Sequence, residues 1–498
     1  MLSLFLLLAC TPLSISLDKG DPGDNGGGAD TSPVPALTLS GPGAIDPLLA
    51  PAITWTITET AGEALELDVI DPDGDVVRTL VDGSDLPPTV VFDGRDAAGE
   101  LLPRGAYTIR GSLLSGGVEV ATAERPVWVV RVGVSSGTLG GERVPLCWHA
   151  AGGSGMYYDG GADTPTFQIG AIDVDGVATP LPTPWEDLDA PPMDLVGQNL
   201  PAAYPYDATP TLSLVVAGET VGAPISARLQ GWTVTGGAAT AGETLQLVAD
   251  TPLATSVGVV EPVLTLEWMT GEDVFATQSL PLRIYALYDT PDFGQTGLPY
   301  QPWVAAIDPL LRDLSASKVA ATPEAVGAGV VDFVYYQLGL RYDTRYGASA
   351  YVQYRGNGYD GAHLDLTSFL SRSRGPVVNC TDCAGLVETY GTMIGLDLSY
   401  AIILQNYNLN QIRAIGSDTY SNCPFGPGGC GFSYHAVTTP DNTSTIYDAT
   451  LALDGDDDPG STPSTELMVH GIPGDEYLYR LVMSGTAHYA HVQKGTFQ

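Results

Sequence analysis

The sequence predicts a multidomain protein that is all-β from residue 36 to 285 and α+β from residue 286 to 498. Three observations lead to this fold class. A chain of 498 residues is longer than one hydrophobic core usually serves. Short strands of alternating apolar and polar residues, separated by Gly and Asp turns, recur in the first region. Helical spacing of apolar residues begins in the second.

The N-terminal segment predicts export. Residues 1–17 begin with an apolar run far shorter than the about 20 residues that cross a bilayer, which is typical of a signal segment. The sequence at 7–10 resembles a bacterial lipobox and makes Cys10 the predicted lipidation site, the alternative being an ordinary short signal. Residues 18–35 are rich in Asp, Gly, Pro and Ser and predict a disordered tether. No membrane-spanning helix is expected.

Two all-β domains are predicted next. Residues 36–132 have the short alternating strands of a β-sandwich. The turn at 93–100 and the strand at 104–110 resemble the immunoglobulin-like domain of the flagellar hook-capping protein family, which implies a spacer or adhesion role. Residues 133–285 continue in strand-like segments with Pro- and Gly-rich interruptions, and predict a second β-rich domain without an assigned function.

The region 286–498 is predicted to be α+β. The Thr-Pro-Glu sequence at 322–324 has the cap, the proline and the acid of a helix start, and a helix is expected to about residue 340. Gly327 and Gly329 within this stretch weaken the helical pattern. A second helix is expected to begin at Cys380.

A cysteine, a histidine and an aspartate are predicted to meet in this domain. Cys380 opens the second helix, where the free N–H groups and the positive end of the dipole favour a thiolate. His435 lies in an alternating strand at 432–438, and Asp448 lies in the next strand at 445–448. If these strands pair in antiparallel fashion, Asp448 orients the imidazole of His435. The three residues would then be nucleophile, base and orienting acid.

Simpler interpretations exist for each residue. Cys380 and Cys383 also fit a buried pair, a redox motif or half of a metal site. A zinc site needs two further ligands, and the spacing of Cys423 and Cys430 is poor for a zinc knuckle. A lone histidine or strand-end aspartate is usually structural. The order of the three residues and the matching secondary structure favour catalysis, with no metal and no cofactor.

These residues resemble the transglutaminase-like superfamily, whose members share a papain-like core. The C-x-D-x-A pattern occurs at 380–384, followed by a histidine strand and an aspartate strand. The resemblance implies that Cys380 is the nucleophile, His435 the base and Asp448 the orienting acid. The side chain of Asn379 and the backbone N–H of Cys380 are the candidate oxyanion donors.

The other cysteines suggest a local disulfide. Cys423 and Cys430 bracket a turn-rich loop of Pro and Gly and are predicted to pair. Cys147 and Cys383 then remain, either bonded across domains or buried as small apolar side chains.

The sequence has 20 Lys and Arg against 58 Asp and Glu, which gives a net charge of −38. This charge argues against nucleic acid as a partner. The acidic clusters at 71–75 and 454–458 do not fit an EF-hand loop and are predicted to be a turn and a solvated loop. His488 and His491, three residues apart, are predicted to lie in a frayed tail rather than to bind a metal.

The expected function is an exported, lipid-anchored cysteine enzyme that acts on amide bonds through an acyl-enzyme at Cys380. Its expected substrates are proteins or peptides of the cell envelope or the exterior, and the acyl acceptor is water or an amine. The expected location is the outer membrane or cell surface, otherwise the periplasm or the medium, with membrane contact through the lipid only. The alternative is a non-catalytic adhesive or structural lipoprotein whose transglutaminase-like domain only binds.

Overall fold

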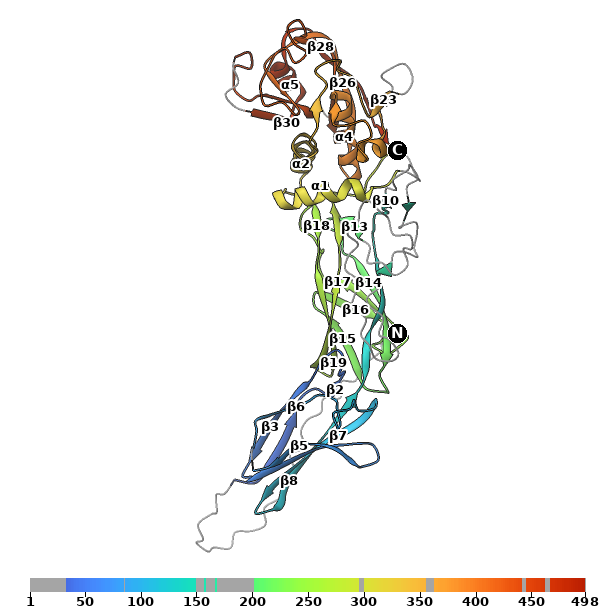
Figure 1. The fold of residues 1–498 in the computed structure, drawn as a ribbon, viewed down its shortest axis with the longest axis vertical. Coiled ribbons are helices and arrows are strands. Elements are labelled where there is room, and N and C mark those ends of the chain that lie inside the picture. The colour runs from blue at the N-terminus through green and yellow to red at the C-terminus, as the bar shows by residue number, and fades with distance from the viewer. Residues whose placement is uncertain are drawn as a thin grey trace, which may run out of the picture.

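The protein is long and mostly β, with sheets that follow one another along its long axis and most of its helices gathered at one end (Figure 1). The predicted signal segment 1–17, Cys10 and most of the tether 18–35 lie outside the described residues. In the described part, no helix is both long and apolar enough to cross a bilayer. The computed structural model describes residues 33–84, 86–148, 156–157, 166–167, 201–294, 300–354, 362–440, 445–461 and 466–497.

The first β region consists of two sheets that share one hydrophobic core. Its strands are β1 (Ala36–Ser40), β2 (Ala44–Ile45), β3 (Ile53–Thr60), β4 (Ala64–Ile70), β5 (Val76–Gly83), β6 (Thr89–Phe92), β7 (Gly105–Ser115) and β8 (Val118–Val129). One sheet has the order β1-β3-β6, and the other has the order β2-β8-β7-β4-β5. Residues of β3 alternate between buried and exposed, as the sequence pattern predicts for a strand with one face in a core.

The second β region continues the same elongated stack. Its strands are β9 (Arg131–Gly140), β10 (Cys147–Trp148), β11 (Met156–Tyr157), β12 (Thr166–Phe167), β13 (Ala202–Pro205), β14 (Thr211–Glu219), β15 (Ile225–Leu229), β16 (Trp232–Gly236), β17 (Thr244–Ala249), β18 (Gly258–Val260), β19 (Val263–Thr270), β20 (Asp273–Pro281) and β21 (Ile284–Leu287). They form sheets of order β12-β9-β14-β17-β16, β15-β19-β20, β13-β21-β18 and β10-β11.

The regions join without flexible linkers among the described residues. Only Val130 separates β8 from β9, and the buried Arg131 forms an ion pair with the buried Asp46. The boundary predicted at 285 falls inside β21, where the Tyr285 hydroxyl donates to Asp308 (2.8 Å) in the first helix beyond it. Neighbouring regions are therefore tied together by buried polar contacts as well as by shared core.

The C-terminal region is α+β. Its helices are α1 (Val304–Ser317), α2 (Pro323–Asp332), the π-helix η1 (Phe333–Gln337), α3 (Leu366–Leu370), α4 (Cys380–Met393) and α5 (Gly474–Leu481). Its strands are β22 (Arg341–Tyr342), β23 (Val352–Tyr354), β24 (Ala362–Leu364), β25 (Val377–Val378), β26 (Leu398–Leu409), β27 (Ile412–Ala414), β28 (Gly431–Pro440), β29 (Thr445–Asp454), β30 (Glu466–Pro473), β31 (Val482–Gly485), β32 (His488–Gln493) and β33 (Thr496–Phe497).

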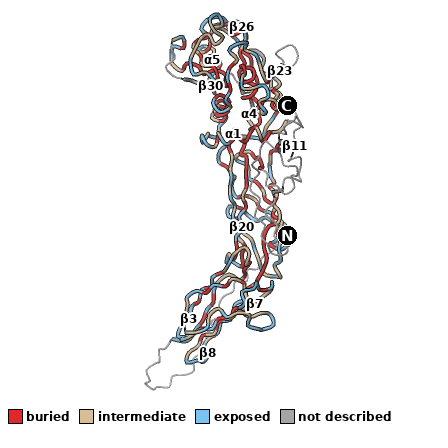
Figure 2. The backbone as a smooth tube through the Cα atoms, in the orientation of Figure 1, coloured by how far each residue is buried: buried red, intermediate tan, exposed pale blue. Residues whose placement is uncertain are grey.

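The main sheet of this region has the order β27-β29-β28-β26-β31, with β30 paired to β29 and β32 paired to β26. Helix α4 packs against β26, β28 and β29, and every one of its residues is buried (Figure 2). The N-terminus of α4 is thereby held at fixed distance from the strands that carry His435 and Asp448. Such rigid support on two elements suits a site that needs precise geometry.

The helix predicted over 322–340 is present but ends as a π-helix. The Thr322 hydroxyl caps α2 by accepting from the Ala325 N–H, as its sequence predicts. The two glycines allow close packing: a Cβ at Gly327 would lie 2.5 Å from the Tyr447 ring, and one at Gly329 would lie 2.4 Å from Leu314. Glycine has a low helix propensity, so these two residues weaken the helical pattern in the sequence. In the structure they are needed for close tertiary packing.

Candidate active site

Cys380 is the first residue of α4, at the end of the helix whose N–H groups have no acceptor within the helix. Asn379 before it is the N-cap, and its side-chain oxygen accepts from the Asp382 N–H (3.1 Å). The Asp382 carboxylate in turn accepts from the Asn379 N–H (3.1 Å). This capping box fixes where the helix starts, and so places the positive end of the helix dipole at Cys380.

The Asn379 side chain, a predicted oxyanion donor, makes structural hydrogen bonds at the start of α4. Its oxygen caps α4, its Nδ2 donates to the Gly347 carbonyl (3.0 Å), and the residue is 1% exposed. The amide oxygen and one of the two Nδ2 hydrogens are therefore used in structural hydrogen bonds. The backbone N–H of Cys380 is the other predicted donor.

His435 and Asp448 lie side by side, on β28 and β29 respectively. The predicted antiparallel pairing of these strands is confirmed through Thr438, which lies opposite Tyr447. His435 Nε2 is 3.0 Å from Asp448 Oδ2, and both side chains are buried. Since a carboxylate only accepts, Nε2 carries a proton and Nδ1 is left to serve as the acceptor in the neutral ring.

Two residues that the sequence did not reveal complete this arrangement. The Tyr477 hydroxyl on α5 donates to Asp448 Oδ2 (2.7 Å), the oxygen that also faces His435. The Phe432 ring stacks on the imidazole, with centroids 5.3 Å apart and an angle of 11° between the planes. Asp448 Oδ1 accepts from the Thr450 N–H (2.7 Å), so both carboxylate oxygens are fixed.

The electrostatics of the site favour an imidazolium. Burial by itself lowers the pKa of His435, but the charge and hydrogen bond of Asp448, together with Cys380, raise that pKa to about 10. Asp448 occupies the Nε2 side of the ring. Nδ1 has no hydrogen-bond partner among the described residues. A cationic ring next to a thiol stabilises the thiolate.

We expect the hydroxyl of Tyr477 to contribute to the stability of the protein through its hydrogen bond to Asp448. In Tyr477→Phe the ring remains, while Asp448 Oδ2 loses a hydrogen bond to a buried charge, so we expect the free energy of unfolding to fall by about 2 kcal/mol in urea titrations. Tyr479→Phe, in the same helix, is the matched control. Because the Tyr479 side chain is 60% exposed, this substitution should change the free energy of unfolding very little. Equal losses in the two variants would contradict the positioning role.

Cys383 lies one turn after Cys380 and has a different environment. Burial, and next the charge of Asp382, raise the pKa of Cys383 well above its ordinary value, so it remains a neutral thiol. Cys383 forms no disulfide with Cys380 or with Cys147, and all three are buried. Of the two alternatives for Cys147 and Cys383, the structure shows buried side chains rather than a cross-domain bond.

A pocket of about 310 Å³ opens beside Cys380. Its walls are largely aromatic, and Cys380 is 3% exposed at its edge. The other lining residues are Tyr342, Arg345, Tyr346, Gly347, Phe425, Gly431, Phe432, Ser433 and Tyr434. We call this space the Cys380 pocket. It provides a route by which a substrate group reaches a largely buried thiol.

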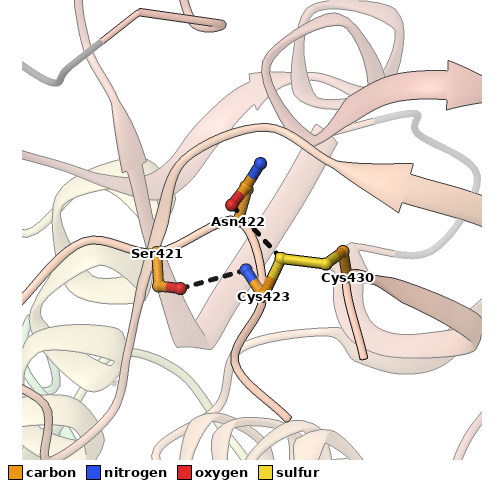
Figure 3. The surroundings of a disulfide bond; sticks show 4 residues. All are labelled: Ser421, Asn422, Cys423 and Cys430. Atoms are coloured by element: carbon orange, nitrogen blue, oxygen red, sulfur yellow. Dashed lines mark hydrogen bonds between the residues drawn. A yellow bond between two sulfur atoms is a disulfide. The ribbon is translucent and has the colours of Figure 1, made fainter. Parts of the chain in front are cut away.

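The predicted disulfide between Cys423 and Cys430 is confirmed. It closes the loop that carries Phe425 into the Cys380 pocket, and Figure 3 shows the Ser421 hydroxyl accepting from the Cys423 N–H beside it (3.0 Å). The Leu409 N–H donates to the Cys430 carbonyl (2.9 Å) and fixes the other end of the loop to β26. The loop is thus a rigid wall of the pocket.

Hydrogen bonds within the protein fix both acidic clusters. The Asp71 carboxylate accepts from the N–H groups of Asp73 and Asp75, which makes the predicted turn. In the cluster at 454–458, Arg480 donates to the carbonyls of Asp454 and Asp456. No group of three metal-ligating side chains is found among the described residues. His488 lies in β32 rather than in a frayed tail, and the side chain of His491 lies outside the described residues.

No family model matches this chain. Nor does any curated protein sequence match it.

Proposed function

We propose that this protein is a cysteine enzyme of the transglutaminase-like type, which transfers the acyl group of an amide through a thioester at Cys380. The observation that carries the proposal is the buried His435–Asp448 pair, which leaves Nδ1 without a partner among the described residues, on a strand packed against the helix that Cys380 opens. Nucleophile, base and orienting acid come from three different elements of one rigid core. The adjoining pocket gives the substrate access.

The chemistry follows from these positions. The Cys380 proton moves to His435 Nδ1, and the sulfur attacks the carbonyl carbon of the amide. The imidazolium then protonates the departing nitrogen, the C–N bond breaks and an amine leaves. Water or a second amine attacks the thioester, gives its proton to Nδ1 and releases the acyl group, which restores the thiol. Asp448 holds the ring and stabilises its charge throughout.

The oxyanion of each tetrahedral intermediate requires hydrogen-bond donors. The Cys380 N–H belongs to the first turn of α4, and the neighbouring capping box satisfies Asn379 and Asp382 but not this group. It points from the positive end of the helix dipole, which favours a developing negative charge. We therefore assign this N–H as one oxyanion donor.

Alkylation of the thiol tests the proposal directly. We expect iodoacetamide to label Cys380 of the wild-type protein, as located by peptide mass mapping, at a rate with a plateau at neutral pH. His435→Ala should shift this profile to higher pH and lower the neutral-pH rate at least about tenfold, because the cation that stabilises the thiolate is gone. Cys383→Ala is the matched control and should leave the profile unchanged, since Cys383 is a buried neutral thiol.

The same measurement separates the enzyme from the alternative of a non-catalytic adhesive or structural protein. A profile that ignores His435 would reject the enzyme proposal and favour the alternative. A thioester adduct at Cys380, trapped with an activated acyl donor and lost in Cys380→Ala, would establish the acyl-enzyme. The disulfide is typical of proteins that fold outside the cytosol, so we propose exported protein or peptide substrates.

A further inference from the structure

The Cys380 pocket has a strongly aromatic lining. The Phe425 ring lies 5.8 Å from Tyr342 and 5.7 Å from Phe432, measured between centroids. Tyr346 and Tyr434 also border the space. With about 310 Å³, the pocket is at the small end of ligand sites and suits one large side chain with its flanking backbone. Aromatic walls of this kind gain most from aromatic or large apolar groups.

The charge of the pocket is opposite to that of the protein. Acidic residues outnumber basic ones by 58 to 20 in the chain, yet no acid lines the pocket, and Arg345 is its only charged lining residue among those described. The Arg345 guanidinium lies over the Tyr346 ring, 4.8 Å from its centroid. Stacking of this kind leaves the N–H edge of the guanidinium available for a carboxylate.

The nearest acid in sequence does not neutralise Arg345 by a direct ion pair. Both oxygens of Asp343 accept from backbone N–H groups of the following turn, those of Arg345, Tyr346 and Ala348. These hydrogen bonds and the charge of Arg345 lower the pKa of Asp343 despite some desolvation. Asp343 therefore shapes the turn that presents Arg345 to the pocket.

We propose that the Cys380 pocket binds an aromatic or large apolar side chain of the acyl donor, and that Arg345 at its rim binds a carboxylate on the adjacent residue. This inference rests on the proposed function and names its substrate class: acidic peptides with an aromatic residue beside the acid. Phe425 is the specificity-determining residue for the apolar part. The Cys423–Cys430 disulfide holds it in place.

Binding to an inactive protein tests the inference apart from catalysis. Cys380→Ala is titrated with three fluorescein-labelled hexapeptides that differ only in a central Phe-Glu, Phe-Lys or Ala-Glu pair, and fluorescence anisotropy gives each Kd. We expect Phe-Glu to bind most tightly. Phe-Lys should bind about tenfold more weakly, because attraction to Arg345 becomes repulsion, and Ala-Glu about tenfold more weakly, because the aromatic walls stay unfilled.

Matched variants assign each preference to its residue. Arg345→Gln should bring the Phe-Glu and Phe-Lys affinities to within about twofold. Arg341→Gln, which removes the same charge from an exposed residue that does not line the pocket, should preserve their ratio. Phe425→Ala, and the double variant Cys423→Ser with Cys430→Ser, should remove the preference for Phe over Ala while the preference for Glu remains.

Several outcomes would overturn the inference. These are equal binding of the three peptides, the absence of saturable binding by any of them, or the same loss of the Glu preference in Arg341→Gln as in Arg345→Gln. An active enzyme without peptide selectivity would refute the pocket assignment and leave the proposed function standing. Selective binding by a protein whose wild type forms no acyl-enzyme would refute the proposed function instead.

Discussion

Asparagine in place of Asp448 should slow the proposed acyl transfer about 10³- to 10⁴-fold, measured as the rate of thioester formation. Asp448 accepts from Thr450 at Oδ1 and from both His435 and Tyr477 at Oδ2. An amide has only one accepting end, so either orientation opposes an N–H or O–H donor. With the amide nitrogen toward the ring, Nδ1 of His435 carries the proton and no longer accepts one from Cys380.

The substitution should also change how stability depends on pH. His435 has a pKa of about 10 in the folded protein, above its ordinary value of about 6.5. Its protonation therefore stabilises the fold fully below pH 6.5, and this contribution is lost as pH rises through 10. Without the Asp448 charge, burial lowers the pKa of the ring. Urea unfolding should show Asp448→Asn much less stable than wild type at pH 6 and closer to it at pH 10.

Asp454→Asn is the matched control for both measurements. Asp454 is a fully buried aspartate at the far end of the same strand, and it has no contact with the imidazole. We expect the rate of thioester formation to remain that of wild type in this variant. A comparable loss of rate in the two variants would show that any buried charge of β29 matters, and would contradict the orienting role of Asp448.

The contact between His435 and Asp448 was predictable because two strand-like segments that follow closely in sequence commonly pair as antiparallel neighbours. The pairing of β28 with β29 then brings two residues 13 positions apart in sequence within hydrogen-bond distance. Tyr477 was not predictable in this way. It lies 29 positions after Asp448 on a separate helix, and no spacing rule connects it to that carboxylate.

The sequence at Asn379 fits two roles, a helix N-cap and an oxyanion donor. An asparagine before the first helical residue, with an acid three positions on, is a capping pattern, and the structure uses both ends of its amide for structure. The pattern was present in the sequence, and it predicts the cap better than it predicts an oxyanion donor.

The sequence did not predict helix α1 or strand β26, and the physical reason differs between the two. Pro309 lies inside α1 and argues against a helix there, but the apolar face of α1 is buried in the core and outweighs the lost hydrogen bond. The first half of β26 is a central stretch between β28 and β32, and its residues are buried in succession, so alternation is absent. A central strand of this kind cannot be distinguished by periodicity alone.

Of the substitutions proposed for this protein, Asp382→Ala should cause the largest loss of stability. We expect the free energy of unfolding in urea to fall by about 4 kcal/mol or more. The carboxylate is fully buried and accepts from five donors, the N–H groups of Ala350, Tyr351, Val352 and Asn379 and the Ser349 hydroxyl. Alanine removes the acceptor of all five. The Ser349 hydroxyl and the Val352 N–H keep a second partner in each other's residue, but the N–H groups of Ala350, Tyr351 and Asn379 lose theirs. Each unsatisfied group costs about 1–3 kcal/mol before relaxation.

Asp365 is the control, an aspartate that caps a shorter helix and forms a partly exposed ion pair with Arg374 (3.0 Å). Asp365 caps α3 by accepting from the Ser368 N–H and is partly exposed, so Asp365→Ala should cost only about 1 kcal/mol. If Asp382→Ala is too unstable to purify, Asp382→Asn keeps one accepting oxygen and should lie between the two. Since Asp382 joins the 349–352 segment to the first turn of α4, its loss should also lower iodoacetamide labelling of Cys380 in protein that remains folded. Equal costs at Asp382 and Asp365 would mean that the cap, rather than the five-donor cluster, holds Cys380 in place.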